Sequence, residues 1–289
     1  MWKHENYRVT SAIPGRMAAL GIAAMAIASF VSSASAESLL EKVKNGETIR
    51  LGFTNEPPGA YPGGNGEPLG VENEITLDIL KKMGATKTEP VVTEWGSLVP
   101  GLQAGRFDIV TAGMWIKPDR CRNVLFSEPV AVENGALLVP KGNPEGLHSF
   151  QDVRDKGLTL VTGAGYTSVE AAQKLGLAAD KLMQVAGPPE ILQAVKSGRA
   201  AAGSLDFFNA TGLIKKDKSV ELAEPFASPT PPGYAAIAFS LNEQPMVEAF
   251  NAVLKDYVGS DEMMAVFGKY DYGQANLPDG KKTADLCKN

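Results

Sequence analysis

Short strand-like and helix-like segments alternate from residue 38 onward, and this alternation restricts the fold class more than any other feature of the chain. Ile49, Leu51 and Phe53 alternate with polar or small residues, as expected of a strand. From Gly70 to Gly84, apolar residues then recur at helical spacing, and Gly84 suits the C-terminus of a helix. Strands that alternate with helices predict an α/β fold in which helices flank each sheet.

Two distant stretches of the chain share one pattern. Residues 102–108 and 195–201 each close a predicted helix, continue with Gly and Arg, and open a predicted strand. In both stretches the Gly falls where the left-handed end of a helix requires it. Together with a similar order of elements in the two halves, this predicts two lobes built alike.

The lobe boundaries are predicted from the breaker-rich stretches. We expect residues 37–139 and 240–289 to form the first lobe and residues 140–239 to form the second. The chain would then cross between the lobes near 139–142 and again near 236–239. Two such crossovers make a hinge, and hinged lobes can close around a ligand.

The first 36 residues have the features of a secretory signal. Arg8 and Arg16 precede an uncharged run from Met17 to Val31, and an Ala-x-Ala sequence ends at Ala36. The run is shorter than the ~20 residues that a membrane-spanning helix needs, which disfavours the alternative of an uncleaved anchor. We therefore expect cleavage after Ala36 and a periplasmic protein.

The chain has two cysteines, Cys121 and Cys287. In an exported protein an even number of cysteines predicts a disulfide, which here would hold a polar C-terminal tail. The alternative is two unpaired thiols.

Composition and motifs argue against several classes of function. The chain is 44% hydrophobic and 21% charged with a net charge of −5, and no Lys/Arg cluster predicts binding to nucleic acid or to an anionic membrane. His148 is the only histidine after residue 36, and it lies in a polar segment. Because no nucleophile elbow, phosphate loop or metal-spaced His/Cys cluster is present, we expect no catalysis, no metal and no cofactor.

A loop with binding chemistry follows the predicted strand at Ile109 and Val110. Residues 113–121 bring backbone N–H groups, the ring of Trp115 and the guanidinium of Arg120 to one place. Ligands bind beyond the carboxyl ends of strands in open α/β sheets, and Arg can grip a carboxylate with two hydrogen bonds. The alternative is that Arg120 simply pairs with a nearby surface acid, Asp119 or Glu128.

The opposite charge would come from a second loop at the same edge. Glu56 lies in the loop after the first strand and could meet a cation, although a solvated acid is the alternative. Trp95 follows the second predicted strand and Trp115 the third. Tryptophan is usually a core residue, but two at one sheet edge, with an acid and an Arg, would form a cage for a delocalised cation.

These motifs give the chain a resemblance to a known family. The matching segments are Asn55-Glu56-Pro57-Pro58, residues 96–105, residues 111–121, Phe126-Ser127-Glu128-Pro129, Lys141-Gly142-Asn143-Pro144 and Leu286-Cys287. The chain resembles the polar-amino-acid-type periplasmic binding proteins of ABC importers, and within them the receptors for ectoine and hydroxyectoine. The resemblance covers essentially all of the chain after residue 36. It implies the two-lobed periplasmic binding protein fold of type II, with a mixed sheet in each lobe, and an inner-membrane permease as partner. We expect a monomer that binds a small zwitterion.

The resemblance also implies roles for individual residues. Arg120 would hold the ligand carboxylate, helped by backbone near Gly113 and Trp115. Thr167, at the start of a second-lobe helix, would add a contact to the same carboxylate. Glu56 would receive the cationic nitrogens, and the two tryptophans would line the cage.

Two positions depart from the ectoine receptors. Gly59 stands where those receptors have an aromatic residue, and Tyr61 is the candidate to replace that wall. Asp206 falls where the amino-acid receptors of the family carry the acid that holds the α-ammonium. Three functions therefore remain open: an ectoine receptor, a receptor for a polar amino acid, and a periplasmic dehydratase acting on a cyclic carboxylate.

Overall fold

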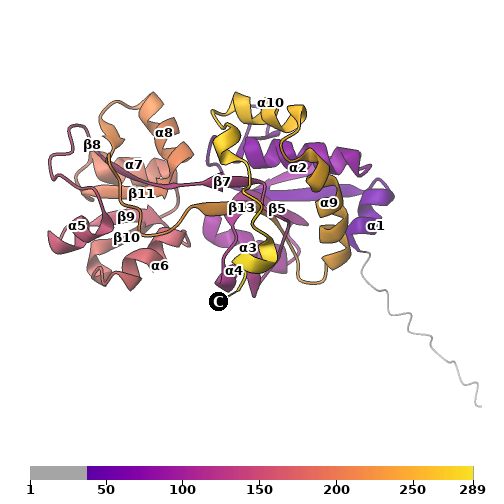
Figure 1. Ribbon diagram of the computed structural model, residues 1–289, viewed down its shortest axis with the longest axis horizontal. Coiled ribbons are helices and arrows are strands. Elements are labelled where there is room, and N and C mark those ends of the chain that lie inside the picture. The colour runs from indigo at the N-terminus through magenta and orange to yellow at the C-terminus, as the bar shows by residue number, and fades with distance from the viewer. Residues whose placement is uncertain (1–37, 289) are drawn as a thin grey trace, which may run out of the picture. The chain divides into compact units, whose positions relative to one another are not determined.

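The computed structural model describes residues 38–288, which are organised around two separate main sheets (Figure 1). We call each sheet with its helices a lobe. The predicted signal at 1–36 lies outside the described residues. No helix in residues 38–288 combines the length and the hydropathy needed to cross a bilayer.

The first lobe has the strand order β4-β1-β5-β13-β6, with β7 also paired to β13. Its strands are β1 (Thr48–Phe53), β4 (Lys87–Val92), β5 (Ile109–Trp115), β6 (Leu125–Phe126), β7 (Ala131–Glu133) and β13 (Gly233–Phe239), with a small hairpin of β2 (Tyr61–Pro62) and β3 (Pro68–Leu69). Its helices are α1 (Leu39–Lys44), α2 (Val71–Lys82), α3 (Leu98–Gln103), α4 (Pro118–Cys121), α9 (Gln244–Tyr257), α10 (Asp261–Lys269) and α11 (Thr283–Leu286), with short 3-10 turns η1 (Trp95–Ser97) and η3 (Gln274–Asn276). Strands β4 and β5 run parallel to β1, whereas β13 runs antiparallel to β5, so the sheet is mixed.

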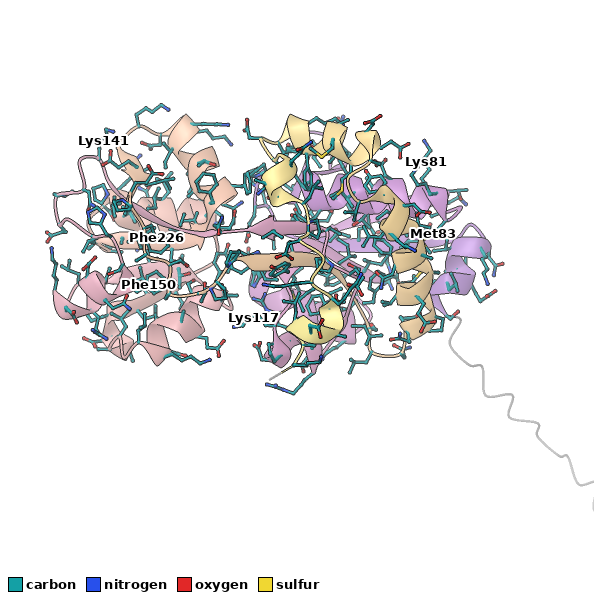
Figure 2. The ribbon with its side chains drawn as sticks, in the orientation of Figure 1. Lys81, Met83, Lys117, Lys141, Phe150 and Phe226 are labelled. Carbon is teal, nitrogen blue, oxygen red and sulfur yellow. A yellow bond between two sulfur atoms is a disulfide. The ribbon has the colours of Figure 1, made fainter. Side chains whose placement is uncertain are left out.

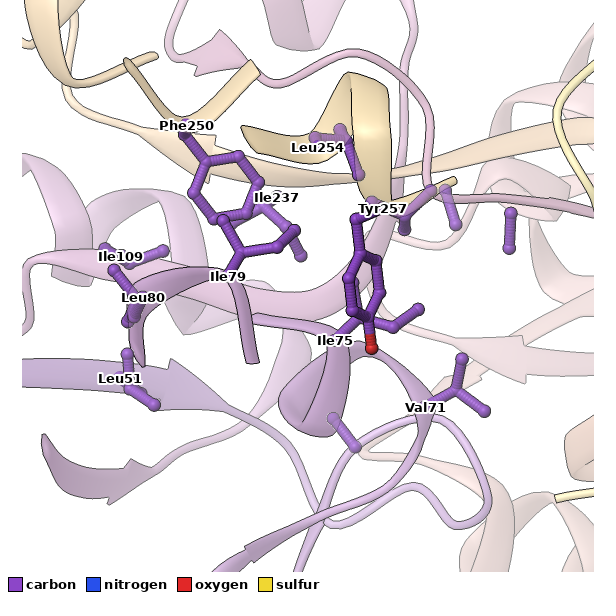
Figure 3. Close-up of a cluster of buried hydrophobic side chains, with 14 of the residues drawn as sticks. Leu51, Val71, Ile75, Ile79, Leu80, Ile109, Ile237, Phe250, Leu254 and Tyr257 are labelled. Carbon is purple, nitrogen blue, oxygen red and sulfur yellow. The ribbon is translucent and has the colours of Figure 1, made fainter. Parts of the chain in front are cut away.

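The core of the first lobe has two sides because neighbouring residues of β5 point to opposite faces of the sheet. Ile109 is buried on the side of α2 and α9, and Val110 is buried on the side of α3. Figure 3 shows how Ile79 of α2 and Phe250 of α9 meet above the sheet. Full burial of such a side chain contributes ~2 kcal/mol, so this packing holds the strand ends that carry the loops described below.

The second lobe has the strand order β10-β9-β11-β8-β12. Its strands are β8 (Gly135–Pro140), β9 (Leu160–Gly163), β10 (Leu182–Val185), β11 (Ala202–Asp206) and β12 (Val220–Leu222). Its helices are α5 (Phe150–Asp155), α6 (Thr167–Lys174), α7 (Pro188–Lys196) and α8 (Phe207–Lys216), with the 3-10 turn η2 (Ala179–Lys181). Helices α7 and α8 cover one face, and α5 and α6 cover the other (Figure 1).

The predicted likeness of the two halves is present in the strand order. In each lobe a central strand lies between two parallel neighbours, as β4-β1-β5 in the first lobe and β10-β9-β11 in the second. Gly105 after α3 has φ +66° and Gly198 after α7 has φ +72°. Both are in the left-handed region that glycine adopts without strain, as the repeated pattern predicted. The α/β class and the two-lobed type II fold are confirmed.

The predicted lobe boundaries need correction at both crossovers. Strand β8 pairs with β11 and β12 in the second lobe, and β13 pairs with β5 in the first. The chain therefore crosses between β7 and β8, at Asn134, and crosses back before Gly233, not near 139–142 and 236–239. An apolar run buried on both faces does not reveal which sheet it joins. The breaker-rich segment 140–144 is a loop within the second lobe.

The predicted disulfide between Cys121 and Cys287 is present and joins residues 166 positions apart. It ties α4, beside the edge of the first sheet, to the end of α11. Two hydrogen bonds also hold the tail, since the Thr283 hydroxyl donates to the Ser127 carbonyl at 2.6 Å and its backbone N–H donates to Glu128 Oε2 at 3.2 Å.

Removal of the disulfide by the double change Cys121→Ser and Cys287→Ser should lower the free energy of unfolding by as much as ~5 kcal/mol, because a long loop in the unfolded chain is no longer closed. Urea unfolding of the oxidised wild type and the double variant measures the difference. Equal midpoints would contradict this prediction.

Candidate functional site

A cavity lined by residues of both lobes has about 790 Å³ of empty space, open solvent included. All seven residues that the sequence analysis selected line it: Glu56, Trp95, Gly113, Trp115, Arg120, Thr167 and Asp206. The first five come from the first lobe, and the last two come from the second.

The topology explains why residues distant in sequence meet here. Glu56 follows β1, and Gly113 and Trp115 end β5, which lies beside β1. Asp206 ends β11, and Thr167 begins α6 after β9, the neighbour of β11. Ligand sites form at the carboxyl ends of such strands, and here the two sheets present these ends to a common cavity.

Arg120 supplies the positive charge of the cavity. Its Nη1 donates to the Trp115 carbonyl at 2.9 Å and its Nη2 to the Gly165 carbonyl at 3.1 Å. Its guanidinium carbon lies 5.5 Å from the centre of the Trp95 ring. Burial lowers the pKa of Arg120 to about 10, so the side chain stays charged at neutral pH.

The alternative interpretation, in which Arg120 pairs with a surface acid such as Asp119 or Glu128, does not fit this geometry. Its hydrogen bonds go to backbone carbonyls, and among residues 38–288 no ion pair within 4.0 Å involves it. Glu128 instead accepts from the tail at Thr283. A half-buried guanidinium that has no carboxylate partner among these residues is suited to an anionic group of a ligand.

Glu56 places a carboxyl group in the same cavity. It is 9% exposed, and burial raises its pKa to about 8. Its loop is held from the second lobe, because Asn209 Nδ2 donates to the Glu56 carbonyl at 3.3 Å and to the Pro57 carbonyl at 3.1 Å. The Tyr166 hydroxyl is buried near Glu56.

Asp206 caps a helix and also places a carboxyl group in the cavity. Its carboxylate accepts from the backbone N–H of Asn209 at 2.8 Å, which caps the start of α8. Burial, with the nearby Glu133, raises its pKa to about 7. A cationic partner stabilises the ionised form of a carboxyl group whose pKa is raised by burial.

Two further carboxyl groups, on Glu72 and Glu133, also line the cavity and were not predicted from the sequence. Glu133 accepts from Trp115 Nε1 at 2.7 Å and from the Tyr272 hydroxyl at 2.6 Å. Glu72 lies in the first turn of α2 and is 1% exposed. One signal was available, because Glu72 shares the buried face of its helix with Thr76 and Ile79.

The aromatic walls agree only partly with the expected cage. Trp95 and Trp115 line the cavity, as do Tyr166, Phe150, Phe226 and Tyr272, which the sequence analysis did not select. Figure 2 labels Phe150 and Phe226 in the second lobe, and their ring centres are 6.2 Å apart. Tyr61 does not line the cavity, because its ring packs edge-on against Tyr270. Tyr61 therefore does not replace the wall missing at Gly59.

Direct bonds between the lobes close one side of the cavity. Trp95 Nε1 donates to the Gly165 carbonyl at 3.2 Å, the carbonyl that Arg120 also uses. Lys117, labelled in Figure 2, forms an ion pair with Glu170 of α6. These contacts hold the start of α6, with Thr167, near the Arg120 loop.

The raised pKa values of the cavity acids predict how stability depends on pH. Between their usual pKa values of 4.5 and 3.8 and the folded values of about 8 and 7, Glu56 and Asp206 bind more protons in the folded state than in the unfolded state. The stability that they contribute is complete at low pH and is lost as pH rises through the folded pKa values. The free energy of unfolding of the ligand-free protein should therefore fall between pH 5 and pH 8, by about 1.4 kcal/mol at most for each pH unit and buried group.

Urea unfolding at pH 5, 6.5 and 8 tests this dependence, with Glu56→Gln expected to reduce the slope. Acids with lowered pKa values, such as Asp108 beside Arg50, finish ionising below this window. A wild-type stability that rises from pH 5 to 8 would contradict the prediction.

Comparison with known proteins gives a consistent picture. The family model of the bacterial extracellular solute-binding proteins, family 3, matches residues 49–274. A probable amino-acid ABC transporter periplasmic-binding protein of Sinorhizobium fredii, y4tE, is 36% identical over 286 residues, which cover 95% of this chain and 94% of the relative. The L-cystine-binding protein TcyJ of Escherichia coli is 28% identical and covers 70% of this chain and 76% of its own length.

Solved structures agree with these relatives. EhuB in complex with hydroxyectoine has a TM-score of 0.80 at 28% identity, covering 87% of this chain and 99% of its own. An ancestral amino-acid-binding protein, a precursor of cyclohexadienyl dehydratase, has a TM-score of 0.71 at 28% identity, covering 81% and 99%. Both the family match, over most of the chain, and the y4tE relative lead to one conclusion. The chain belongs to family 3 of the bacterial extracellular solute-binding proteins.

Proposed function

We propose that this protein is the periplasmic receptor of an ABC importer of the amino-acid type and that it captures a small zwitterion, with ectoine or hydroxyectoine as the first candidate. The observation that carries the proposal is one cavity that holds an unpaired guanidinium, Arg120, together with two acids, the buried Glu56 and the half-buried Asp206. A solute with a carboxylate at one end and a cation at the other neutralises both.

The anionic end of the solute would bind at Arg120. The guanidinium has N–H groups left after its two bonds to backbone carbonyls, and it can donate them to a carboxylate. Thr167, at the start of α6, adds a hydroxyl and the positive end of a helix from the second lobe. The carboxylate would therefore bridge the lobes.

The cationic end would bind between Glu56 and the aromatic rings. A delocalised cation is attracted both by a carboxylate and by the face of a tryptophan ring. Trp95 and Trp115 line the cavity with Glu56, and Tyr166 packs edge-on to Trp95 with ring centres 5.4 Å apart. The likeness to EhuB in complex with hydroxyectoine supports this class of solute.

The two lobes would close around the solute because it binds the closed form more tightly than the open form. A solute that bound the open and closed forms equally would shift nothing, whereas one that touches both lobes favours the closed form. Arg120 and Glu56 on the first lobe, with Thr167 on the second, supply contacts of this kind, and Asp206 adds one for an amino acid. The closed form would then dock on a permease in the inner membrane, as a monomer exported by the signal at residues 1–36.

A polar amino acid is the second candidate, and Asp206 favours it. This carboxylate is raised in pKa and lines the cavity, where it could receive an α-ammonium. The name of the y4tE relative, a probable amino-acid binding protein, supports the same alternative.

Arg120→Ala should remove binding of carboxylate solutes and leave the fold intact, because the guanidinium supplies the charge and the side chain is outside the main cores. Arg122→Ala is the matched control, since Arg122 is exposed and lies on the same short helix end. Isothermal titration with ectoine and glutamine measures both variants. Affinity of the wild-type level in Arg120→Ala would refute the placement of the site.

A thermal-shift panel should separate the two candidates. A solute at a hundred times its dissociation constant stabilises the folded state by roughly 2.7 kcal/mol. Ectoine should raise the melting temperature of the wild type, and Asp206→Asn should retain most of this shift. A shift with glutamine but not with ectoine, lost in Asp206→Asn, would assign the amino-acid function instead.

A further inference from the structure

We propose that Glu72 and Glu133 form a second cation subsite in the cavity, separate from Glu56, and that a cationic group of the solute displaces a proton held between them. This inference rests on the proposed solute-binding function and extends it. It favours the second candidate, a polar amino acid, since the solute would carry two cationic groups, each an ammonium or a guanidinium, together with its carboxylate.

Glu72 supplies the unsatisfied atom of this subsite. The residue is 1% exposed, it lines the cavity, and its Oε2 has no hydrogen-bond partner among the described residues. A buried polar atom without a partner is unfavourable. At a cavity wall it marks a place where a donor from a ligand would be stabilised.

Two glycines make room for the Glu72 carboxyl group. A Cβ on Gly113 would lie 2.8 Å from its carboxyl carbon, and a Cβ on Gly59 would lie 3.1 Å from Oε2. Gly113 also has φ +62°, which other residues rarely adopt. The absence of an aromatic ring at Gly59, which the sequence analysis treated as a missing wall, thus gives space to an acid.

Glu133 is held in place by its own donors. Its Oε2 accepts from Trp115 and its Oε1 accepts from Tyr272, so both oxygens are occupied. Gly233 allows the Trp115 ring to lie directly against β13, since a Cβ there would come within 1.9 Å of the ring. Glu133 is therefore the fixed member of the pair, and Glu72 is the member with a free oxygen.

Glu72 and Glu133 together carry one negative charge and one proton. Burial and the adjacent Glu133 raise the pKa of Glu72 well above its usual value, and burial also raises the pKa of Glu133. Two buried carboxyl groups that line one cavity and repel each other do not both ionise readily, so the pair retains one proton at neutral pH. The other titratable groups facing the pair are Asp206 from the second lobe and Tyr272 after α10.

The charge of the cavity supports a second cationic group. Among residues 38–288, its lining has four carboxyl groups, on Glu56, Glu72, Glu133 and Asp206, but one guanidinium. The raised pKa values of these acids leave protons on them in the ligand-free protein, so the cavity can accept a second cation by releasing a proton. When a second cation arrives, the proton between Glu72 and Glu133 leaves to solvent, and the free oxygen of Glu72 then accepts an N–H donor from the solute.

The test compares L-arginine with L-citrulline, which has the same shape and lacks the side-chain charge. Isothermal titration in phosphate and in Tris at pH 7.5 gives both the affinity and the number of protons released. We expect the wild type to bind arginine about tenfold or more tightly than citrulline, as charged hydrogen bonds imply, with release of up to one proton.

Glu72→Gln keeps the size of the side chain and can donate to Glu133 as the protonated acid does. It should bring the ratio of the two affinities close to one and remove the extra proton released with arginine relative to citrulline, while citrulline affinity stays unchanged. Glu248→Gln is the matched control, because Glu248 is exposed on α9. A purely structural role for Glu72 predicts a lower melting temperature of the ligand-free variant, whereas the subsite predicts an equal or higher one.

The outcomes separate this inference from the function that it extends. If ectoine binds in an Arg120-dependent way while arginine and citrulline bind equally well, the subsite is refuted and the receptor function stands. If CaCl₂ or ZnCl₂ alone raises the melting temperature of the wild type but not of Glu72→Gln, the pair binds a metal and the organic-cation subsite is refuted. If none of the three solutes binds, both proposals fail.

Discussion

The arrangement of this protein depends on burying charges of both signs in one cavity without pairing them to each other. Arg120 keeps its guanidinium against backbone carbonyls and a tryptophan ring, while the acids face the cavity from other elements. Unpaired buried charges cost free energy, and burial shifts their pKa values in the direction of the neutral form. A ligand with complementary charges removes this cost, which is why an unfavourable arrangement in the ligand-free protein favours capture.

The rest of the fold holds these groups in place. The apolar contacts of α2 and α9 fix β1 and β5, whose ends carry Glu56 and Trp115. The Cys121–Cys287 disulfide anchors α4, the short helix that contains Arg120, to the C-terminal tail. Asn209, beside the cap of α8, reaches across to the Glu56 loop. Each lobe thus contributes a stable edge, and a small number of polar contacts join the two edges.

Much of this could be predicted from the chain alone. Strand and helix periodicity gave the α/β class, and the repeated Gly-Arg pattern indicated two similar lobes, since Gly105 and Gly198 both end helices with positive φ. The lobe boundaries were wrong because β8 and β13 are apolar on both faces, and such runs do not reveal their pairing partners. Glu72 was missed because it lies in an otherwise regular amphipathic helix, where an acid near the N-terminus is common.

The sequence by itself determined the elements, the chemical types available at their ends and the cysteines that could pair, because these depend on local periodicity and on side-chain chemistry. Tertiary structure alone decided which acids share a cavity, that Tyr61 turns toward Tyr270 while Tyr166 and Tyr272 line the site, and where the chain changes sheets. The physical reason is that strand pairing and burial are set by contacts between residues far apart in the chain, so the environment that shifts a pKa or leaves an oxygen unpartnered exists only after folding.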